Sequence, residues 1–507
     1  MNGRILAPLA RSRGGGRARR GRGVLIALLG LGLAACDSGA QLSGAGAPTP
    51  ISPATATVVA TIPATPVPAG GTAEPQPVNA GSAVVAGGDW PMYGHDAART
   101  NYNPAETSIS AANAAQLAPR WQANIGAGTG PPSGAPSVAA GHVYVASSAT
   151  SGPNFFAFDA ATGIVNWSAD LGHGAGCFGV GIGATPAISG SVVVAGGGDS
   201  AYYGLDAATG AQLWRDPLNA GPSAFPWASP LIADGRAYLG VASGCDNPSV
   251  RGELRAVNAQ DGSFIATQYF VPAGQAGAGI WNSPALSPDG GTLAVATGED
   301  YGGYNGPYNR AMVALDPLTL AIQGANQQGQ LDQDKDYATT PIIFHDSRNR
   351  TLIAAHHKDE SFYVYDLHNL AAGPIWQRQT GTIIGMMPAY DPAQGPGGTL
   401  LFLDGLGRLN AVDPATGADR WPAVMVGSAR GNMAVANGLV YLNLGSGGVA
   451  VVNETTGHLV TTLQPPNADK AYSGVVVSAG FVYWLSGAYL NAWSLPGGAP
   501  PPAVPSQ

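Results

Sequence analysis

The chain has 507 residues, of which 45% are hydrophobic and only 11% charged, and it is rich in Gly (74) and Pro (41). This balance favours many short strands joined by tight turns over long amphipathic helices. Residues 1–35 contain seven arginines and no acidic residue, which leaves the rest of the chain with a formal net charge of −15. So acidic a body is a poor partner for nucleic acid or for an anionic lipid surface.

The first 35 residues predict an export signal. A cationic leader, RSRGGGRARRGRG, precedes an apolar run, GVLIALLGLGLAA, that is too short to span a bilayer comfortably. The run ends in Leu-Ala-Ala-Cys at Cys36, which resembles the lipobox of bacterial lipoproteins. The resemblance implies cleavage before Cys36, a lipid on its sulfur, and an extracytoplasmic protein anchored to a bacterial membrane. The alternative is a plain signal peptide followed by an incidental cysteine.

Composition divides the remainder into three parts. Residues 36–88 are mostly Ala, Gly, Pro, Thr and Ser, which cannot bury a core and predict a disordered tether. Residues 498–507 predict a disordered tail, so one folded body is expected over 89–497. Besides Cys36 the chain has Cys177 and Cys245, which in an exported protein form either a disulfide or two buried thiols.

The body repeats one phrase eight times, typified by FFAFDAATGIVNW at residues 155–167. In it an alternating apolar strand enters Asp-x-x-Thr-Gly, where Asp caps a turn and Gly takes a left-handed conformation. A second strand follows, which in four repeats carries a tryptophan expected to fill the wedge between neighbouring units. The turn anchors lie 40 to 58 residues apart, at Asp159, Asp206, Asn258, Asp316, Asp366, Asp413, Asn453 and Ser494; the four tryptophans are Trp167, Trp214, Trp376 and Trp421.

This spacing is the period of a propeller blade and exceeds that of most solenoid repeats. Two further short strands precede each phrase, so the sequence predicts an all-β protein with eight blades of four antiparallel strands. The eighth unit ends at its third strand. Residues 117–126, LAPRWQANIG, are predicted to supply the missing outer strand and thereby close the ring.

Blade geometry also predicts where a ligand would lie. The Asp-x-x-Thr-Gly turns join the third and fourth strands and lie on one face of the ring. The connections between blades, and those between the second and third strands, lie on the opposite face. Loops from several blades meet there near the axis, so we expect any ligand on that face.

Residues 89–121, beginning DWPMYGHDAART, together with the repeat phrases resemble the pyrroloquinoline quinone (PQQ)-dependent alcohol dehydrogenases over nearly all of 89–497. The resemblance implies a quinoprotein that oxidises an alcohol or polyol by hydride transfer to PQQ, with Ca²⁺ bound beside the quinone. The chain has no Cys-x-x-Cys-His, so it carries no c-type haem and electrons would leave through an external acceptor.

The resemblance assigns the metal site and the base residue by residue. Asp246, which precedes Val250-Arg251-Gly252, takes the position of one metal ligand. Glu299 stands where the family has Asn as a second ligand. In LDQDKDYATTPIIF (331–344), Asp336 matches the catalytic carboxylate, which also reaches the metal, with Asp332 and Asp334 as near alternatives. A carboxylate there would take the alcohol proton, and Ca²⁺ would polarise the quinone carbonyl.

The quinone itself would rest on Trp281, which matches the tryptophan that stacks beneath it in the family. Lys358, one of only three lysines, matches the basic residue at the quinone oxygens, and Arg251 is a further cationic candidate. The family's adjacent pair of cysteines is missing. A Cys177–Cys245 bridge on the same face is a candidate roof over the pocket.

Structural explanations stand beside each of these assignments. Trp281 suits a core or inter-blade tryptophan, the acidic residues suit a solvated loop, and Lys358 suits a surface position. The repeat phrase is also shared by the lipoproteins that take part in outer-membrane barrel assembly, which bind no quinone. The alternative function is therefore a non-catalytic propeller that binds protein or polysaccharide at the cell surface.

Overall fold

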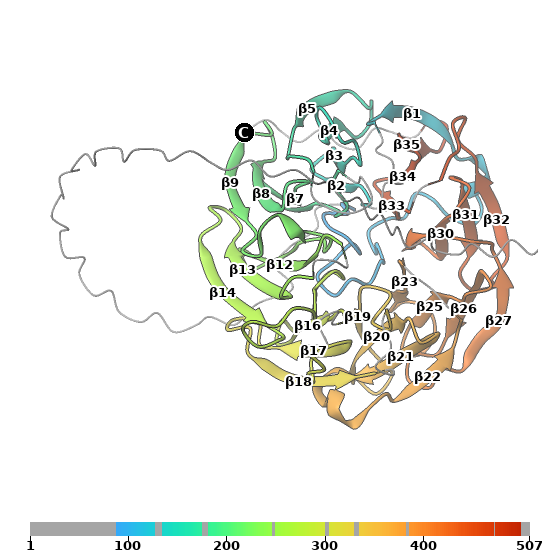
Figure 1. Ribbon diagram of the computed structural model, residues 1–507. Coiled ribbons are helices and arrows are strands. Elements are labelled where there is room, and N and C mark those ends of the chain that lie inside the picture. Colours follow the sequence, from blue (N-terminus) through green and yellow to red (C-terminus); the bar gives the residue numbers. More distant parts are fainter. Residues whose placement is uncertain are drawn as a thin grey trace, which may run out of the picture. The chain divides into compact units, whose positions relative to one another are not determined.

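The computed structural model describes residues 88–126, 134–174, 181–245, 249–299, 304–328, 334–381, 385–470 and 472–497. Within these ranges the chain is almost entirely β-structure and forms eight antiparallel blades around a central axis (Figure 1). The predicted eight-bladed propeller is confirmed. No helix in the described ranges has the length and hydropathy needed to cross a membrane.

Each blade runs from an inner strand at the axis to an outer strand at the rim. Blades one to four consist of β2 (Ser137–Ala139), β3 (His142–Ala146), β4 (Phe155–Asp159) and β5 (Val165–Ala169); β6 (Ala187–Ser189), β7 (Val192–Gly196), β8 (Ala201–Asp206) and β9 (Gln212–Pro217); β11 (Leu231–Ala233), β12 (Arg236–Ser243), β13 (Glu253–Asn258) and β14 (Phe264–Tyr269); and β15 (Ala285–Leu286), β16 (Leu293–Ala296), β17 (Ala311–Leu315) and β18 (Ile322–Gln327). A short extra strand, β10 (Ala224–Phe225), pairs with β12.

Blades five to eight consist of β19 (Ile342–His345), β20 (Thr351–His357), β21 (Ser361–Asp366) and β22 (Trp376–Gln379); β24 (Ala389–Asp391), β25 (Thr399–Leu403), β26 (Arg408–Val412) and β27 (Asp419–Met425); β29 (Ala434–Ala436), β30 (Leu439–Asn443), β31 (Val449–Asn453) and β32 (Leu459–Leu463); and β33 (Val475–Ser478), β34 (Phe481–Ser486), β35 (Tyr489–Ser494) and β1 (Ala118–Asn124). Two short strands, β23 (Met386–Met387) and β28 (Gly431–Asn432), pair in parallel, and three short 3₁₀ turns complete the described elements: η2 (Ala114–Gln116), η3 (Gly221–Ser223) and η4 (Leu367–Ala372).

The ring closes as the sequence predicts. β1, from the N-terminal part of the body, pairs antiparallel with β35 near the C-terminal end, in a register that places Ala118 opposite Ser494 and Asn124 opposite Tyr489. The eighth blade is therefore built from both ends of the body. This pairing covers the free edges that an open array of blades would expose.

The repeat phrase forms the turn that its residues predict. In the first blade the Asp159 carboxylate accepts hydrogen bonds from the Thr162 backbone N–H at 2.8 Å and the Thr162 hydroxyl at 2.7 Å. The next residue, Gly163, has a φ of +72°, a conformation that glycine adopts at little cost. The same capping contacts recur at Asp206, Asp316, Asp413 and Asn453.

The repeat tryptophans lie between blades, as predicted. The Trp167 indole N–H donates to the Ala207 carbonyl of the next blade at 3.0 Å, and its ring covers Gly210, where a Cβ would come within 2.5 Å of the ring. A side chain on that glycine would displace the tryptophan. Equivalent indole contacts to the following blade are made by Trp121, Trp214, Trp376 and Trp421.

The segment 88–103, which we call the plug, lies at the centre of the ring and is blue in Figure 1. It bonds to the inner strands of blades on all sides; among these contacts Trp90 pairs with Val138 and Asn101 with Val435. Arg99 is fully buried and donates to the carbonyls of Tyr93, Pro230 and Pro284. Buried carbonyls beside the inner strands of blades three and four thereby find a donor, and the plug fills one end of the axis.

A buried carboxyl group predicts how stability depends on pH. Glu454 is 2% exposed, and burial, with the nearby negative charge of Asp391, raises its pKa to about 10. The folded protein keeps Glu454 protonated while the unfolded chain ionises near pH 4.5, so the free energy of unfolding falls as pH rises from about 4.5 to about 10. We expect Glu454→Gln to stabilise the protein by about 2–4 kcal/mol at pH 8 and little at pH 4.5, because one pKa unit is worth about 1.4 kcal/mol.

Urea unfolding of the wild type and Glu454→Gln at the two pH values measures this difference. Glu360 is exposed, and Glu360→Gln serves as the control that removes a glutamate without removing a buried carboxyl group. An equal effect of Glu454→Gln at both pH values would contradict the assignment of a protonated buried carboxyl.

Candidate functional site

A cavity of about 500 Å³ opens on the face predicted to bind a ligand. Its walls come from the loops that enter blades three, four, five and eight and from the connections between second and third strands in blades three, four and five. The lining residues are Trp227, Ala242, Ser243, Gly244, Gly277, Gly279, Trp281, Gly298, Glu299, Asp334, Asp336, Lys358 and Tyr472. Five of the residues that the resemblance identified, Trp281, Glu299, Asp334, Asp336 and Lys358, therefore meet in one cavity.

Asp336 is the most buried of these five residues and is 1% exposed. Its Oδ2 accepts a hydrogen bond of 2.7 Å from the Trp281 indole N–H, and its Oδ1 lies 2.7 Å from Lys358 Nζ. Both contacts hold the carboxylate in one orientation. A buried carboxylate fixed by two donors is suited to receive a proton from a substrate held above it.

The backbone brings Lys358 and Asp336 together. Tyr337 and His357 form an antiparallel bridge, and the Lys358 backbone N–H donates to the Asp336 carbonyl at 2.8 Å. The loop that enters blade five thus adds a short strand alongside the end of β20. This pairing explains why a lysine at the end of an apolar strand lies in the cavity and not in solvent.

Lys358 links the acidic residues to the aromatic wall. Besides Asp336, its ammonium group pairs with the carboxylate of Asp334, and it lies 5.0 Å from the centre of the Trp281 ring. Only 13% of the Lys358 side chain is exposed. A cation so placed is available to an anionic or carbonyl oxygen of a flat ligand lying on Trp281.

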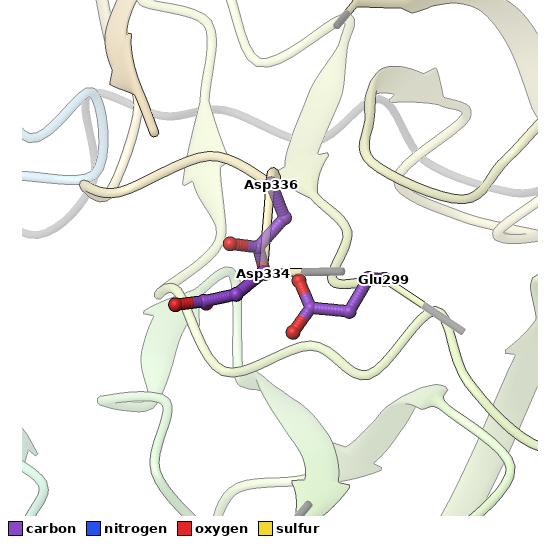
Figure 2. A group of neighbouring side chains, drawn as sticks. All are labelled: Glu299, Asp334 and Asp336. Atoms are coloured by element: carbon purple, nitrogen blue, oxygen red, sulfur yellow. The ribbon is translucent and has the colours of Figure 1, made fainter. Parts of the chain in front are cut away.

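Three carboxylates form the acidic side of the cavity. Oxygens of Glu299, Asp334 and Asp336 all lie within 4.8 Å of one another, and Figure 2 shows the Glu299 side chain grouped with those of Asp334 and Asp336, which belong to one loop. Glu299 and Asp336 are buried, and the Asp334 side chain is 66% exposed. Carboxylate oxygens at such spacing can share a hard cation.

Burial and the neighbouring opposite charge have opposing effects on the pKa values of Asp336 and Lys358. Burial raises the pKa of Asp336 to about 8; the Lys358 ammonium group acts to lower it, and the Glu299 carboxylate acts to raise it. Burial opposes the charge of Lys358, but Asp336 and Glu299 nevertheless hold the pKa of Lys358 above its ordinary value. The lysine therefore stays charged at neutral pH, and the Asp336 carboxyl binds a proton far more readily than an ordinary aspartate.

The structure does not bring every predicted residue to this cavity. Arg251 packs over the Tyr269 ring, 3.8 Å from its centre, and donates to the Val271 carbonyl at 2.9 Å; it does not line the cavity. Its contact with the quinone stays a prediction. Cys36, Cys177, Asp246 and Asp332 lie outside the described residues, so lipidation, the Cys177–Cys245 bridge and the Asp246 ligand also stay predictions.

Two aromatic residues of the cavity were not predicted from the sequence. Trp227 and Tyr472 line it, and the Trp227 indole N–H donates to the Ser243 carbonyl at 2.9 Å. A signal for Trp227 was present, because Trp227-Ala-Ser-Pro and Trp281-Asn-Ser-Pro occupy the same place in consecutive repeats. Nothing in the sequence around Tyr472 distinguishes it.

The residues present fit a flat, anionic cofactor and a cation. Trp281 offers an aromatic surface, Lys358 a charge at its edge, and the three carboxylates a hard-cation site within the same 500 Å³ cavity. A Cβ at Gly298 would lie 3.3 Å from Asp336 Oδ2, so the absence of a side chain keeps this wall open. The donor set therefore agrees with a quinone and a bound metal ion.

Two characterised enzymes are similar in sequence. Polyvinylalcohol dehydrogenase of a Pseudomonas species is 25% identical over 274 residues, which are 47% of this chain and 40% of the relative. Quinohemoprotein alcohol dehydrogenase of Comamonas testosteroni is 26% identical over 381 residues, 66% of this chain and 52% of the relative. The chain thus spans about half the length of these relatives, or less.

Solved structures share the propeller fold. The Comamonas testosteroni quinohemoprotein alcohol dehydrogenase superposes with a TM-score of 0.66 at 20% identity, covering 84% of this chain and 83% of the other. A europium-containing methanol dehydrogenase gives 0.66 at 15% identity, over 80% and 98% of the two chains. BamB of Moraxella catarrhalis gives 0.52 at 16% identity, over 76% and 99%.

A family model matches most of the folded body. The model described as outer membrane protein assembly factor BamB covers residues 105–316 and 324–499, well over half of the chain. The repeat phrase, the number of blades and the sequence matches all indicate the same family. The chain belongs to this PQQ-type propeller family and is related to the quinoprotein alcohol dehydrogenases.

Proposed function

We propose that the protein is a PQQ- and metal-dependent dehydrogenase that oxidises an alcohol or polyol and passes electrons to an external acceptor. The observation that carries the proposal is the convergence of Trp281, Asp336 and Lys358 with two further carboxylates in one cavity on the predicted face. The names of the two characterised relatives, an alcohol dehydrogenase and a polyvinylalcohol dehydrogenase, support the same class of substrate.

Different residues of the cavity would transfer the proton and bind the quinone. Asp336, fixed by the Trp281 indole N–H and by Lys358, would accept the proton of the substrate hydroxyl. Lys358 and the face of Trp281 would bind and orient the quinone. The bound PQQ would supply the hydride acceptor, which no amino-acid side chain provides.

The metal would lie among Glu299, Asp334 and Asp336, with Asp246 as a predicted further ligand. Three carboxylates place up to three negative charges at one site, which suits Ca²⁺ and suits a trivalent lanthanide still better, because Coulomb attraction scales with the cation's charge. The europium in the name of one structural neighbour supports testing both cations.

Titration of the purified protein with PQQ, with and without Ca²⁺ or Eu³⁺, tests the proposal. We expect saturable, metal-dependent quenching of tryptophan fluorescence and alcohol-dependent reduction of a dye. Trp281→Ala should weaken PQQ binding by at least about fivefold, because stacking on an aromatic face is worth about 1 kcal/mol or more. Trp376→Ala, an inter-blade tryptophan outside the cavity, controls for loss of a tryptophan as such.

The competing function gives a different result. A non-catalytic scaffold, supported by the description of the matching family, would bind neither PQQ nor metal at micromolar concentration. Absence of both kinds of binding would therefore overturn the dehydrogenase proposal in favour of the scaffold.

A further inference from the structure

A second cavity adjoins the first and lies on the propeller axis. We call this cavity of about 410 Å³ the axial well. It shares Trp227, Trp281 and Tyr472 with the carboxylate cavity, so the two spaces meet at these rings. The rest of its wall comes mainly from the loops and residues that lead into the inner strands of blades two to seven.

The axial well is closed at the plug. Tyr93 of the plug lines it, while plug residues 95–98 line a separate cavity with the inner-strand ends of blades four to six. Arg99 fastens this part of the plug through the Tyr93 and Pro284 carbonyls. The axial well therefore ends at the plug on one side and is continuous with the carboxylate cavity at the shared rings.

Four hydroxyl groups of the axial well accept backbone hydrogen bonds from the preceding blade. Thr185 accepts from Ala135 at 2.7 Å, and Ser229 accepts from Thr185 at 3.0 Å. Ser283 accepts from Ser229 at 2.9 Å, and Thr340 accepts from Ser283 at 3.0 Å. Each of the four residues is at most 5% exposed.

Each of these hydroxyl groups can still donate a hydrogen bond to a ligand. A hydroxyl that accepts a backbone N–H still has its own O–H to donate, and within the described part of the chain none of the four donates a hydrogen bond. Between them lie apolar surfaces, including Trp281 and Met387. The wall therefore combines buried donors with apolar contacts, which suits a ligand that alternates oxygen atoms with methylene groups.

We propose that the axial well binds the oxygen-rich chain of an extended alcohol whose terminal hydroxyl lies at Asp336. This inference rests on the proposed dehydrogenase function and specifies its substrate as a polyol or oligoether. An alkyl chain of equal length would bury the four hydroxyls without giving them acceptors, and sites built to hydrogen-bond a ligand reject analogues that lack the partner.

Substrate selectivity of the wild type tests the inference directly. We expect the full-length protein, loaded with PQQ and Ca²⁺, to oxidise triethylene glycol with a kcat/KM at least about tenfold higher than that for 1-nonanol, a chain of the same length. Equal values, or a preference for 1-nonanol, would overturn the inference.

A variant separates the donor from the shape of the axial well. Thr340→Val keeps the volume and removes the hydroxyl, and should lower the ratio of kcat/KM for triethylene glycol to that for 1-nonanol by about fivefold or more. Thr340→Ser returns a hydroxyl and should restore the ratio. A ratio that does not change in Thr340→Val would count against the inference; the wild-type comparison stands if this variant fails to fold.

Ethanol, which is too short to fill the axial well, separates the two proposals. If the protein oxidises ethanol but does not prefer triethylene glycol to 1-nonanol, the axial-well inference is overturned and the dehydrogenase proposal stands. Failure of every alcohol to reduce the dye, with PQQ and metal bound, would overturn both.

Discussion

Asp336→Asn should lower kcat for alcohol oxidation by about 10²–10⁴-fold while PQQ remains bound. Asn has nearly the same shape, and its carbonyl oxygen can still accept the hydrogen bond from the Trp281 indole N–H. It cannot accept the substrate proton. Because the substitution also removes one of three grouped carboxylates, metal affinity should fall, so kcat is measured at saturating metal and quinone.

Asp334→Asn is the matched control for this experiment. Asp334 belongs to the same group of carboxylates and pairs with the same lysine, but its side chain is 66% exposed and does not contact Trp281 in the described structure. We expect its kcat to fall less than tenfold. If Asp336→Asn keeps more than a tenth of wild-type kcat with quinone and metal saturated, Asp336 is not the base.

The repeat phrase made the fold predictable from the sequence. Asp-x-x-Thr-Gly is a local signal, because the capping contacts of Asp159 span only a few residues and Gly163 must adopt a positive φ. Counting these turns gives the number of blades, and the odd strand count of the last blade identifies β1 as its partner. Local chemistry repeated around the ring therefore determines a global architecture.

The positions of the plug and of Tyr472 are set by contacts between residues far apart in sequence, which no local sequence pattern predicts. Arg99 is fully buried, although arginine is usually exposed, because it satisfies carbonyls more than 130 residues away in sequence. Tyr472 is likewise brought to Trp281 only by closure of the ring. Periodicity predicts which strands form, and it does not predict what fills the axis between them.

The candidate site was predicted in part for a related reason. Asp336 and Lys358 could be chosen from matched sequence motifs, and the bridge between Tyr337 and His357 explains why they meet. Arg251 matched a motif too, but the neighbouring Tyr269 ring and Val271 carbonyl hold its guanidinium group away from the cavity. A motif gives the position of a backbone, and the partners of a long side chain decide where its charge lies.

Lys358→Met should change the affinities for quinone and metal in opposite directions. Met keeps an apolar chain near Trp281 but removes the ammonium group that lies 2.7 Å from Asp336 Oδ1. The quinone then loses its cationic partner, and we expect PQQ affinity to fall at least about tenfold, the value of one lost charge-assisted hydrogen bond. The carboxylates lose a competing cation, so affinity for Ca²⁺ should rise by a similar factor.

Without ligands the same variant should lose little stability at pH 7.5, because loss of the ammonium group raises the pKa of Asp336 still further and the buried carboxyl then binds a proton. Because the variant should bind Ca²⁺ more tightly, saturating Ca²⁺ should raise its Tm by more than it raises the Tm of the wild type. Lys335, which donates to the Lys358 carbonyl from a partly exposed position, supplies the control Lys335→Met. A parallel loss of both affinities would mean a collapsed cavity. Opposite changes would mean that the same ammonium group attracts the quinone oxygens and competes with the metal ion for the carboxylates.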